Sequence, residues 1–464
     1  MSSFTEVPVL DYSLSLDEAT KSTFLDELRH VLLEVGFCYI KNTGIDEALQ
    51  TEVVRQANAF FDLPESEKLR IEMKNSPHFL GYNRLGSEIT AHHTDHREQL
   101  DLATELTAPS PKEPRYRNLR GPNQWPDEAL IPGFRETYNA YITAMTALST
   151  DFLSLVAQAI GLPKETFEKY FEGVGESESG TKRQDKIKIV KYPDLTELGT
   201  EGGQGVGPHK DSMLSSYLLQ ATDHLGLQAQ NSKGEWVDCP QIPGTFAMGQ
   251  GLEAMTDGVC IATTHRVLSP TAGSGPRLSI PFFQGVSYDA TFESMEVPEE
   301  VKALKKSLVS REEVEMTFKK EKFERLGEAT LMNRIQSHPD VGAKYYPDLL
   351  ALQRVQAAAI NEAAAVKRAE TLLVVPGPAN TLSDDTADPP KMRRRAPTII
   401  VEKVSTDTAY GEDPGPDGSI ERKEAWKMRQ ADAVPDVVRV IDSEEGEKVE
   451  VGLGLKGKVG GLAP

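Results

Sequence analysis

The sequence predicts a mainly β protein with flanking helices, whose core is a double-stranded β-helix, or jelly roll. The first observation is a dense succession of short, strand-like runs in the middle of the chain, at residues 186–192, 215–220, 226–230, 245–249, 259–267 and 277–284. Closely spaced strands of this kind are typical of antiparallel barrels and jelly rolls. The second observation is helical periodicity on both sides of these strands, which predicts helices that flank the core.

The N-terminal part of the chain alternates helix and strand. Apolar residues between positions 17 and 35 recur on one helical face, and the pattern stops at Gly36, a residue type that often follows a helix. A strand-like run at 37–41 comes next, and a second helix is expected to run through Phe60 and Phe61. This order predicts an α/β segment that leads into the core.

Longer helices are predicted before and after the strands. The first covers residues 134–161, and two more cover 311–331 and 348–371. His338 falls between the last two, and we expect it on the surface. By analogy with relatives of similar layout, the C-terminal helices are expected to pack over the mouth of the barrel.

The composition changes near Pro376, where Pro, Gly and charged residues replace the helical pattern. Such a segment has too little apolar surface to build a core, so we expect it to be disordered. We therefore divide the chain into an N-terminal α/β region at 1–115, helical support with the jelly-roll core at 116–300, a C-terminal helical region at 301–375 and a tail at 376–464.

Charge and composition limit the partners. The chain has 464 residues, a formal net charge of −20 and a pI near 5.0, so the phosphates of nucleic acids would be repelled. No apolar run approaches the length of a membrane span, and the first 20 residues lack a basic, apolar signal. Three cysteines give neither a disulfide framework nor a metal-binding spacing. These features predict a cytoplasmic protein that binds neither nucleic acid nor membrane; they do not predict its oligomeric state.

The most informative motif is His209-Lys210-Asp211, which is followed by His265 in a later strand-like run. Two imidazoles and one carboxylate can hold iron(II) on one triangular face, leaving three coordination positions for other ligands. Residues i and i+2 at a strand end can lie on the same side, as this pair requires. The sequence therefore predicts an iron site made of His209, Asp211 and His265.

A second copy of the His-x-Asp pattern, His93-Thr94-Asp95, is a decoy. No histidine lies between His96 and His209 to supply a third ligand at a comparable spacing. We therefore interpret this copy as a solvated polar loop.

With the metal motif, other segments of the chain resemble the iron(II)/2-oxoglutarate-dependent dioxygenases, in the subgroup that includes isopenicillin N synthase. The resemblance covers about residues 5 to 290. Its segments are Val7-Pro8-Val9-Leu10-Asp11, the run from Gly36 to Ile45, the run from Trp236 to Phe246, and the run from Arg277 to Phe283. This resemblance implies an oxidoreductase that uses Fe(II), 2-oxoglutarate and O2 to oxidise a C–H bond of a small organic molecule. A role in secondary metabolism is implied in the same way.

The resemblance also implies the residues that bind the cosubstrate. Arg277 and Ser279 would hold the distal carboxylate of 2-oxoglutarate, and a guanidinium with a neighbouring hydroxyl suits a buried carboxylate. Tyr192 matches a family tyrosine that reaches the cosubstrate, although a packing role explains it equally well. For the primary substrate the candidates are Phe79 and Tyr82, in a segment that resembles the family's pocket lid, and Phe283.

Two departures from the family pattern weaken the cosubstrate assignment, and two alternatives stay open. Val190 stands where the family often has Asn, and Gln250 stands where it usually has Asp. In isopenicillin N synthase the Arg-x-Ser pair binds a substrate carboxylate instead, so an iron-dependent oxidase without 2-oxoglutarate is one alternative. The other is a binding protein that keeps the jelly roll without catalysis.

Overall fold

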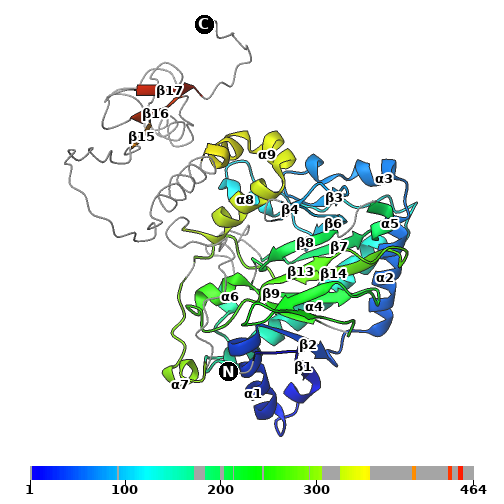
Figure 1. The fold of residues 1–464 in the computed structure, drawn as a ribbon, viewed down its shortest axis with the longest axis vertical. Coiled ribbons are helices and arrows are strands. Elements are labelled where there is room, and N and C mark those ends of the chain that lie inside the picture. Colours follow the sequence, from blue (N-terminus) through cyan, green and yellow to red (C-terminus); the bar gives the residue numbers. More distant parts are fainter. Residues whose placement is uncertain are drawn as a thin grey trace, which may run out of the picture. The chain divides into compact units, whose positions relative to one another are not determined.

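Figure 1 shows the computed structural model of the chain. It describes residues 3–90, 93–171, 183–198, 203–212, 214–242, 245–291, 293–305, 324–355, 400–403, 437–441 and 448–452. The chain divides into two compact units, Met1–Ala359 and Ile360–Pro464. In the second unit the described residues form one antiparallel sheet of β15 (Ile400–Lys403), β16 (Val437–Ile441) and β17 (Lys448–Gly452). The predicted disorder of 376–464 falls mostly on residues outside those described and stays a prediction.

The first unit is built around two facing sheets. The major sheet has eight strands in the spatial order β1 (Val9–Asp11), β2 (Phe37–Lys41), β12 (Thr245–Met248), β9 (Ser215–Gln220), β14 (Arg277–Phe283), β7 (Lys186–Tyr192), β6 (Glu98–Ala103) and β3 (Gly81–Asn83). The minor sheet has four, in the order β11 (Trp236–Asp238), β10 (Leu227–Gln230), β13 (His265–Leu268) and β8 (Gln204–His209). Every pairing is antiparallel except that of β1 with β2.

A buried apolar cluster joins the two sheets face to face. It contains Val190 and Tyr192 from the major sheet together with Val206, Leu227 and Val267 from the minor sheet. Two antiparallel sheets closed over a common interior make a jelly roll, so the predicted fold class is confirmed. A short hairpin of β4 (Ile89–Thr90) and β5 (His93–Thr94) stands apart from both sheets.

Helices cover the outer face of the major sheet. On β14, Leu278, Ile280 and Phe282 point outward into the largest apolar cluster, which also holds residues of the long helix α4. The α-helices of the first unit are α1 (Lys21–His30), α2 (Glu47–Phe61), α3 (Glu65–Arg70), α4 (Phe134–Ala159), α5 (Leu195–Leu198), α6 (Gln250–Met255), α7 (Glu299–Lys302), α8 (Leu326–Ser337) and α9 (Pro339–Tyr345). A π-helix, η2 (Val31–Val35), continues α1, and short 3-10 helices cover Tyr12–Ser15, Met73–Asn75, Arg115–Leu119 and Glu168–Tyr170.

Between the outward-pointing residues of the major sheet lie residues whose side chains point to the opposite side, and we call the surface that they form the inner face. Its members are Ser216, Leu218 and Gln220 on β9; Arg277, Ser279, Pro281 and Phe283 on β14; Lys186, Lys188, Val190 and Tyr192 on β7; and Gln99, Asp101 and Ala103 on β6. Side chains alternate between the two faces of a strand, so the inner face is set by the outward packing of the residues between. The inner face is the more polar of the two.

Helix α4 is the one described helix that is long and apolar enough to cross a bilayer by length and composition. The expectation that no apolar run approaches that length is therefore not met. In the fold, 56% of its most apolar window is buried, and Tyr138, Phe152 and Val156 are among its fully buried residues. The core helix of a globular domain has the same composition.

Most predicted elements are present, and three expectations need correction. The predicted strand at 259–267 is a strand only from His265, because Ile261 donates its backbone N–H to Leu32 and the preceding residues turn across the end of η2. Strand β8, which ends at His209, is not among the strands predicted from the sequence. His338 is buried, at 2% exposure, so its predicted surface position is wrong. Most of the predicted helix 311–331 lies outside the described residues, and 347–355 is helical within the predicted 348–371.

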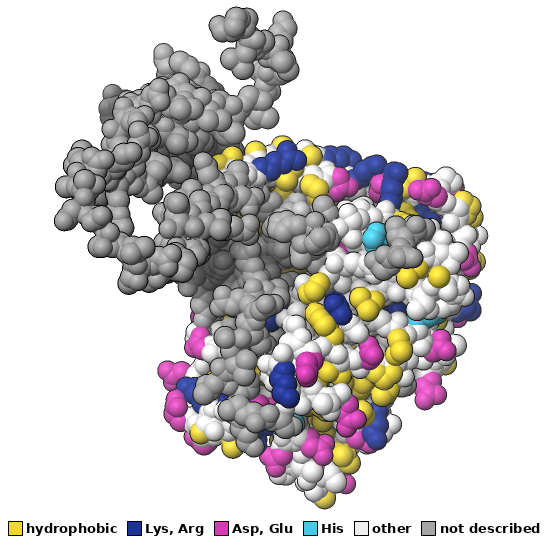
Figure 2. All heavy atoms as spheres, viewed as in Figure 1, with side chains coloured by type: hydrophobic (Ala, Val, Ile, Leu, Met, Phe, Trp, Pro, Cys, Tyr) yellow, Lys and Arg dark blue, Asp and Glu magenta, His cyan; other side chains and the backbone are white. Residues whose placement is uncertain are grey.

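The predicted N-terminal region and core share one sheet. Strands β1, β2, β3 and β6 lie within 1–115, and they pair with strands from 116–300. The chain therefore does not divide physically at residue 115. In the view of Figure 2, acidic and basic side chains are interspersed over the described part of the surface.

Candidate metal centre

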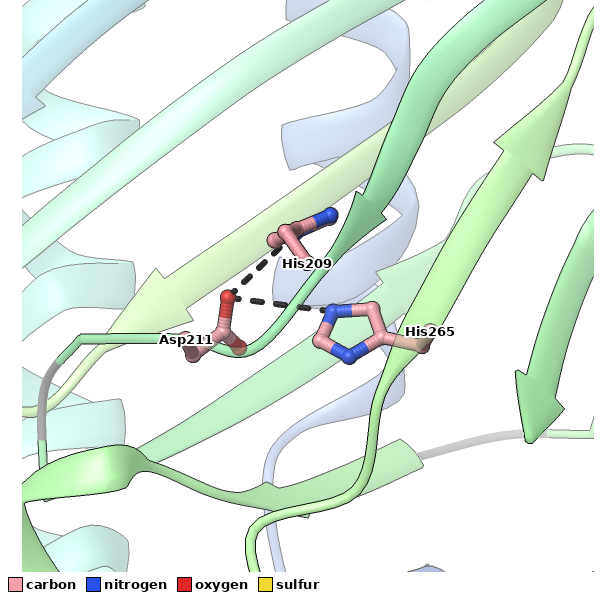
Figure 3. Close-up of side chains that lie close together, drawn as sticks. All are labelled: His209, Asp211 and His265. Carbon is pink, nitrogen blue, oxygen red and sulfur yellow. Dashed lines mark ion pairs between the residues drawn. The ribbon is translucent and has the colours of Figure 1, made fainter. Parts of the chain in front are cut away.

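The three predicted metal ligands meet at the end of the minor sheet (Figure 3). His209 is the last residue of β8 and His265 is the first residue of β13, and the two are directly paired in the antiparallel register. Asp211 follows two residues after the end of β8, where the chain turns back toward the pair. The strand pairing therefore brings together residues that are far apart in the sequence.

The spacing of the donor atoms suits one metal ion. Asp211 Oδ1 lies 3.7 Å from His209 Nε2 and 3.7 Å from His265 Nε2. All three donor atoms lie within 4.8 Å of one another, and this is the group of metal-binding side chains found among the described residues. Adjacent ligands of an octahedral ion with bonds of about 2.1 Å are about 3 Å apart, so each of the two Asp–His pairs is under an ångström wider than a bound ion requires.

Backbone carbonyls orient both imidazoles. His209 donates from Nδ1 to the carbonyl of Gly207 at 2.8 Å, and His265 donates from Nδ1 to the carbonyl of Thr263 at 3.1 Å. A carbonyl can only accept, so Nδ1 carries the proton in each ring and Nε2 keeps its lone pair. Metal-binding histidines are usually held in this way. Both Nε2 atoms face Asp211.

Two further contacts fix the carboxylate and its surroundings. Ser216, on the inner face of β9, donates its hydroxyl to Asp211 Oδ2. Oδ1 is the oxygen that faces the two imidazoles, so the serine leaves the metal-facing oxygen available. Lys210, between the two ligands of the motif, points to Glu253 of α6 with an Nζ–Oε2 distance of 2.8 Å.

The protonation states favour cation binding. The surrounding protein disfavours a charged imidazolium at His209, and the nearby His265 adds to this effect, so the pKa of His209 falls to about 4. Burial opposes ionisation of Asp211, but His265, His209 and the hydroxyl of Ser216 outweigh it and hold the pKa of Asp211 below its usual value. At neutral pH the site therefore offers a neutral His209 and an anionic Asp211, as a divalent cation requires.

Arg277 is buried on the inner face with part of its head group unpaired. The residue is 1% exposed; its Nη2 donates to Gln220 Oε1 at 3.2 Å, whereas Nε and Nη1 have no partner among the described residues. Ser279, two residues further along the same face, is 2% exposed. Tyr192 is the register partner of Arg277, and its ring centre lies 5.3 Å from the guanidinium carbon.

This arrangement fits a carboxylate ligand. An unpaired buried N–H is unfavourable, and Nε with Nη1 forms one edge of the guanidinium fork, which matches the two oxygens of a carboxylate. The hydroxyl of Ser279 lies on the same inner face, one step along the strand. The structure thus brings the predicted residues Arg277, Ser279 and Tyr192 together.

The three candidate substrate residues are not placed alike. Phe283 lies on the inner face of β14, in register with Ser216. Phe79 is fully buried and stacks on Tyr346 with ring centres 5.7 Å apart, within a separate cluster beside α8 and α9. Tyr82 points to the outer face and donates its hydroxyl to Glu98 at 2.6 Å. Because Tyr82 faces away from the inner face, its placement argues against substrate contact, and only Phe283 lies beside the metal centre.

The decoy motif is not a solvated loop throughout. Thr94 is exposed, but Asp95 is fully buried, and its carboxylate contacts Arg97 Nη2 at 3.1 Å and Gln204 Nε2 at 3.2 Å. These contacts tie the β4–β5 hairpin to β8. Asp95 is a structural carboxylate, and the side chain of His93 lies outside the described residues.

Two features of the site were missed by sequence reasoning. Ser216 gives no signal beyond its place in a strand. The inner face also carries a set of charged side chains, Lys186, Lys188 and Asp101, with Arg334 from α8 beside them. The alternation Lys186-Ile187-Lys188-Ile189 could have revealed an amphipathic strand whose polar side is buried.

Two family models match the chain. The model described as "2OG-Fe(II) oxygenase superfamily" matches residues 185–286, which contain all three candidate ligands and Arg277. The model described as "non-haem dioxygenase in morphine synthesis N-terminal" matches residues 7–128.

Curated relatives and solved structures are similar to much of the chain. A "2-oxoglutarate-dependent dioxygenase frbJ" from Dothideomycetidae sp. (strain 11243) is 58% identical and covers 76% of this chain and 96% of its own length. A "2-oxoglutarate-dependent dioxygenase" from Gibberella zeae is 39% identical, covering 76% and 94%. "Homoarginine-6-hydroxylase 2-ODD-C23" from Glycine max is 29% identical, covering 63% and 89%. The crystal structure of a full-length Neurospora crassa protein in complex with alpha-KG and 5-formyluracil has a TM-score of 0.55 at 22% identity, covering 71% of this chain and 96% of that chain, which supports the fold alone.

Proposed function

Because this chain belongs to the 2OG-Fe(II) oxygenase superfamily, we propose that His209, Asp211 and His265 bind its iron(II) ion and that Arg277 binds 2-oxoglutarate. The protein is an iron(II)- and 2-oxoglutarate-dependent dioxygenase. The observation that carries the residue assignment is the convergence of two Nε2 atoms on one carboxylate oxygen, at 3.7 Å each. Iron(II) with 2-oxoglutarate supplies the activation of dioxygen for attack on a C–H bond.

The chain itself contributes positioning. His209, Asp211 and His265 would hold iron(II) through three protein ligands, which would leave the other coordination positions for the cosubstrate and oxygen. Arg277 and Ser279 bind the distal carboxylate of 2-oxoglutarate through the unpaired edge of the guanidinium and the hydroxyl. Because both residues are buried, water is excluded from this carboxylate, which strengthens the interaction. The role of Tyr192 is to pack against the guanidinium.

We propose that the primary substrate is a small organic molecule and that Phe283 forms one wall of its pocket. Relatives at 29–30% identity are named homoarginine-6-hydroxylases, which supports a small polar substrate and hydroxylation as the outcome. A cytoplasmic location and a role in secondary metabolism belong to the same proposal. Both are supported by the family resemblance, and three cysteines that form no disulfide also suit a reducing compartment.

The two alternative functions receive less support. An oxidase without cosubstrate would leave Arg277 for the primary substrate, but the relative at 58% identity is named for its dependence on 2-oxoglutarate. A non-catalytic binding protein would have no need for the intact triad or for the carbonyl contacts that orient both imidazoles.

The test is the visible charge-transfer band that a keto acid gives when it chelates iron(II). We expect the anaerobic protein with iron(II) to develop this band on titration with 2-oxoglutarate. Arg277→Ala removes a charge-assisted contact of about 2–3 kcal/mol, so it should weaken 2-oxoglutarate binding by roughly 30- to 150-fold. Arg266→Ala, on strand β13 of the minor sheet, is the matched control and should keep the wild-type affinity.

The metal assignment is tested in the same titration. His209→Ala should give no band and bind little iron(II), whereas His93→Ala, in the decoy motif, should behave like the wild type. A band that survives in His209→Ala and disappears in His93→Ala would overturn the assignment. Iron binding without any band in the wild type would favour the oxidase, and no iron binding would favour the binding protein.

A further inference from the structure

The second cationic group on the inner face lies at the far end from Arg277. We call it the charged cluster: Lys186 and Lys188 of β7, Asp101 of β6 and Arg334 of α8. Asp101 is 2% exposed, and its Oδ1 lies 3.6 Å from Lys188 Nζ and 3.7 Å from Arg334 Nη2. Both distances are longer than an N–H···O hydrogen bond. The carboxylate of Asp101 is therefore shared by Lys188 and Arg334, and neither cation is within hydrogen-bonding distance of its Oδ1.

Lys186 has no partner at all among the described residues. The residue is 4% exposed, and its Nζ is buried without a hydrogen bond. Burial lowers the pKa of Lys186 well below its ordinary value, and repulsion from Arg334 adds to the effect. An unpaired buried amine is a costly feature, and such groups are retained mostly where a ligand completes them.

When Lys186 is protonated, which a bound anion would favour over the empty site, the charges around the cluster leave one positive charge over. Its cations are Lys186, Lys188 and Arg334, with Arg97 next to them; the carboxylates are Asp101, Glu88 and Asp95. Arg97 forms ion pairs with Glu88, at 2.8 Å, and with Asp95. The positive charge of Arg97 is therefore neutralised, together with part of the negative charge of these two carboxylates. His338 is buried beside Glu88, and its pKa is lowered to about 4, so it adds no charge at neutral pH. A single negative charge would balance the four cations against the three carboxylates.

The register places this cluster beside the metal centre. Ser216, Phe283 and Lys186 lie side by side on β9, β14 and β7, and Ser216 donates its hydroxyl to Asp211. Two strand spacings separate Ser216 from Lys186, about 10 Å. A molecule resting on Phe283 would therefore have the metal on one side and Lys186 on the other.

The cosubstrate cannot serve both cationic ends. Arg277 and Phe283 are six residues apart on β14, which is about 20 Å along a strand, and Lys186 is the register partner of Phe283. If 2-oxoglutarate is bound at Arg277, the unpaired amine of Lys186 is left for another molecule.

We propose that Lys186, supported by Arg334, binds a carboxylate group of the primary substrate and so makes this enzyme selective for small carboxylic acids. The inference rests on the proposed function, because it requires that Arg277 holds 2-oxoglutarate. A carboxylate fits better than a phosphate ester, because the cluster has one positive charge to neutralise and a phosphate would bring close to two negative charges. Phe283 supports the carbon skeleton between the metal and the amine.

The experiment compares acids with their primary amides as activators of 2-oxoglutarate turnover. The probes are L-amino acids, L-homoarginine among them, and short organic acids, each paired with its amide, and succinate release is measured with iron(II) and 2-oxoglutarate. We expect at least one acid to stimulate wild-type turnover more than tenfold better than its amide. Lys186→Met should abolish that preference, and Lys186→Arg should keep part of it.

The matched control is Lys191→Met, since Lys191 belongs to the same strand but faces outward toward Glu98, with an Nζ–Oε1 distance of 3.5 Å. It should keep the preference for acids within about twofold. The inference is overturned if acids stimulate the wild type no better than their amides, including the case in which neither stimulates, or if Lys186→Met keeps the preference.

Two further measurements separate this inference from the proposed function and from a structural role. The charge-transfer band should be unchanged in Lys186→Met; a wild type without the band would instead refute the proposed function. Removing an unpaired buried amine should also raise the melting temperature of the holoenzyme without substrate. A lower melting temperature in Lys186→Met, with the preference for acids intact, would assign Lys186 a structural role.

Discussion

At the scale of single residues, some polar side chains in the interior have hydrogen-bond or ion-pair partners, and others have polar atoms without a partner among the described residues. Asp95 is fully buried and Asp211 is partly buried, and the oxygens of both contact named donors. Arg277 and Lys186 are buried with polar atoms unpaired among the described residues. Burial without a partner is unfavourable, so these two residues point to ligands, whereas the paired carboxylates are explained by the fold or the metal.

The sequence predicted the metal ligands at this scale but not their support. The types and spacing of His209, Asp211 and His265 indicate the chemistry directly. The contacts that orient them are made by backbone carbonyls and by Ser216, and any residue type has a carbonyl. Such contacts leave no trace in the sequence because they depend on where the chain turns.

His338 makes stability depend on pH. Burial outweighs the attraction of Glu88 and, with smaller effects from Arg334 and Lys188, lowers the pKa of His338 to about 4, whereas an unfolded histidine titrates near 6.5. Between these values the unfolded state binds the extra proton, so stability is lost as the pH falls from 6.5 to 4. When the pH is lowered from 7 to 5, the free energy of unfolding should fall in both proteins, and the fall should be about 2 kcal/mol smaller in His338→Gln than in the wild type.

Chemical denaturation at the two pH values measures this difference. His30→Gln is the control, because His30 is an exposed residue of α1 and should leave the wild-type pH dependence unchanged. The same acid sensitivity in His338→Gln as in the wild type would show that His338 does not carry this linkage.

At the scale of elements, most helices and strands could be predicted from the sequence. The prediction was wrong where contacts with distant parts of the chain determine the backbone conformation. Residues 259–264 are as apolar as a strand, but Ile261 and Thr263 hydrogen-bond to η2 and Ala262 donates its backbone N–H to Glu253 of α6. Strand β8 contains Gly205 and Gly207, which disfavour strands locally, yet it is held by pairing with β13. Tertiary pairing outweighed local preference in both cases.

Gly36 connects these elements and tolerates no side chain. Its φ is +70°, and a Cβ there would lie 2.2 Å from the carbonyl oxygen of Ile261. Gly36→Ala would push η2 away from the segment that leads to His265, and we expect a loss of at least about 3 kcal/mol in unfolding free energy together with weaker iron(II) binding.

Gly44→Ala separates steric clash from backbone strain. Gly44 has a similar φ of +77° but nothing within 4 Å of its Cβ position. This variant should lose only about 1–2 kcal/mol, with iron(II) binding unchanged, as measured by denaturation and by metal titration. Equal losses in the two variants would mean that the contact with Ile261 is not responsible.

At the scale of the whole molecule, the class of fold could be predicted and the order of the strands could not. Short strands in close succession indicate a jelly roll. No local sequence pattern, however, predicts that β2 pairs with β12 or that β6 pairs with β7. These pairings join residues more than 80 positions apart, and they decide that the N-terminal region and the core form one unit.

The chain should function without its second unit. Every proposed ligand and pocket residue lies within Met1–Ala359, and the relative at 58% identity aligns over 96% of its own length with only 76% of this chain. We expect a protein truncated after Ala359 to keep the charge-transfer band and a melting temperature within about 2 °C of the full chain. Loss of the band, or a fall of about 5 °C or more, would show that residues 360–464 take part in the fold or the site.

The alternation along β14 and β7 has a consequence for how such enzymes diverge. On each strand, every second residue serves the apolar packing against the helices and the residues between serve the ligands. A substitution at Phe283 or Lys186 can therefore change which molecule is accepted while Phe282 and Ile187 continue to hold the sheet in place. Stability and selectivity are encoded at interleaved positions of the same strands, so natural variation can alter one with little cost to the other.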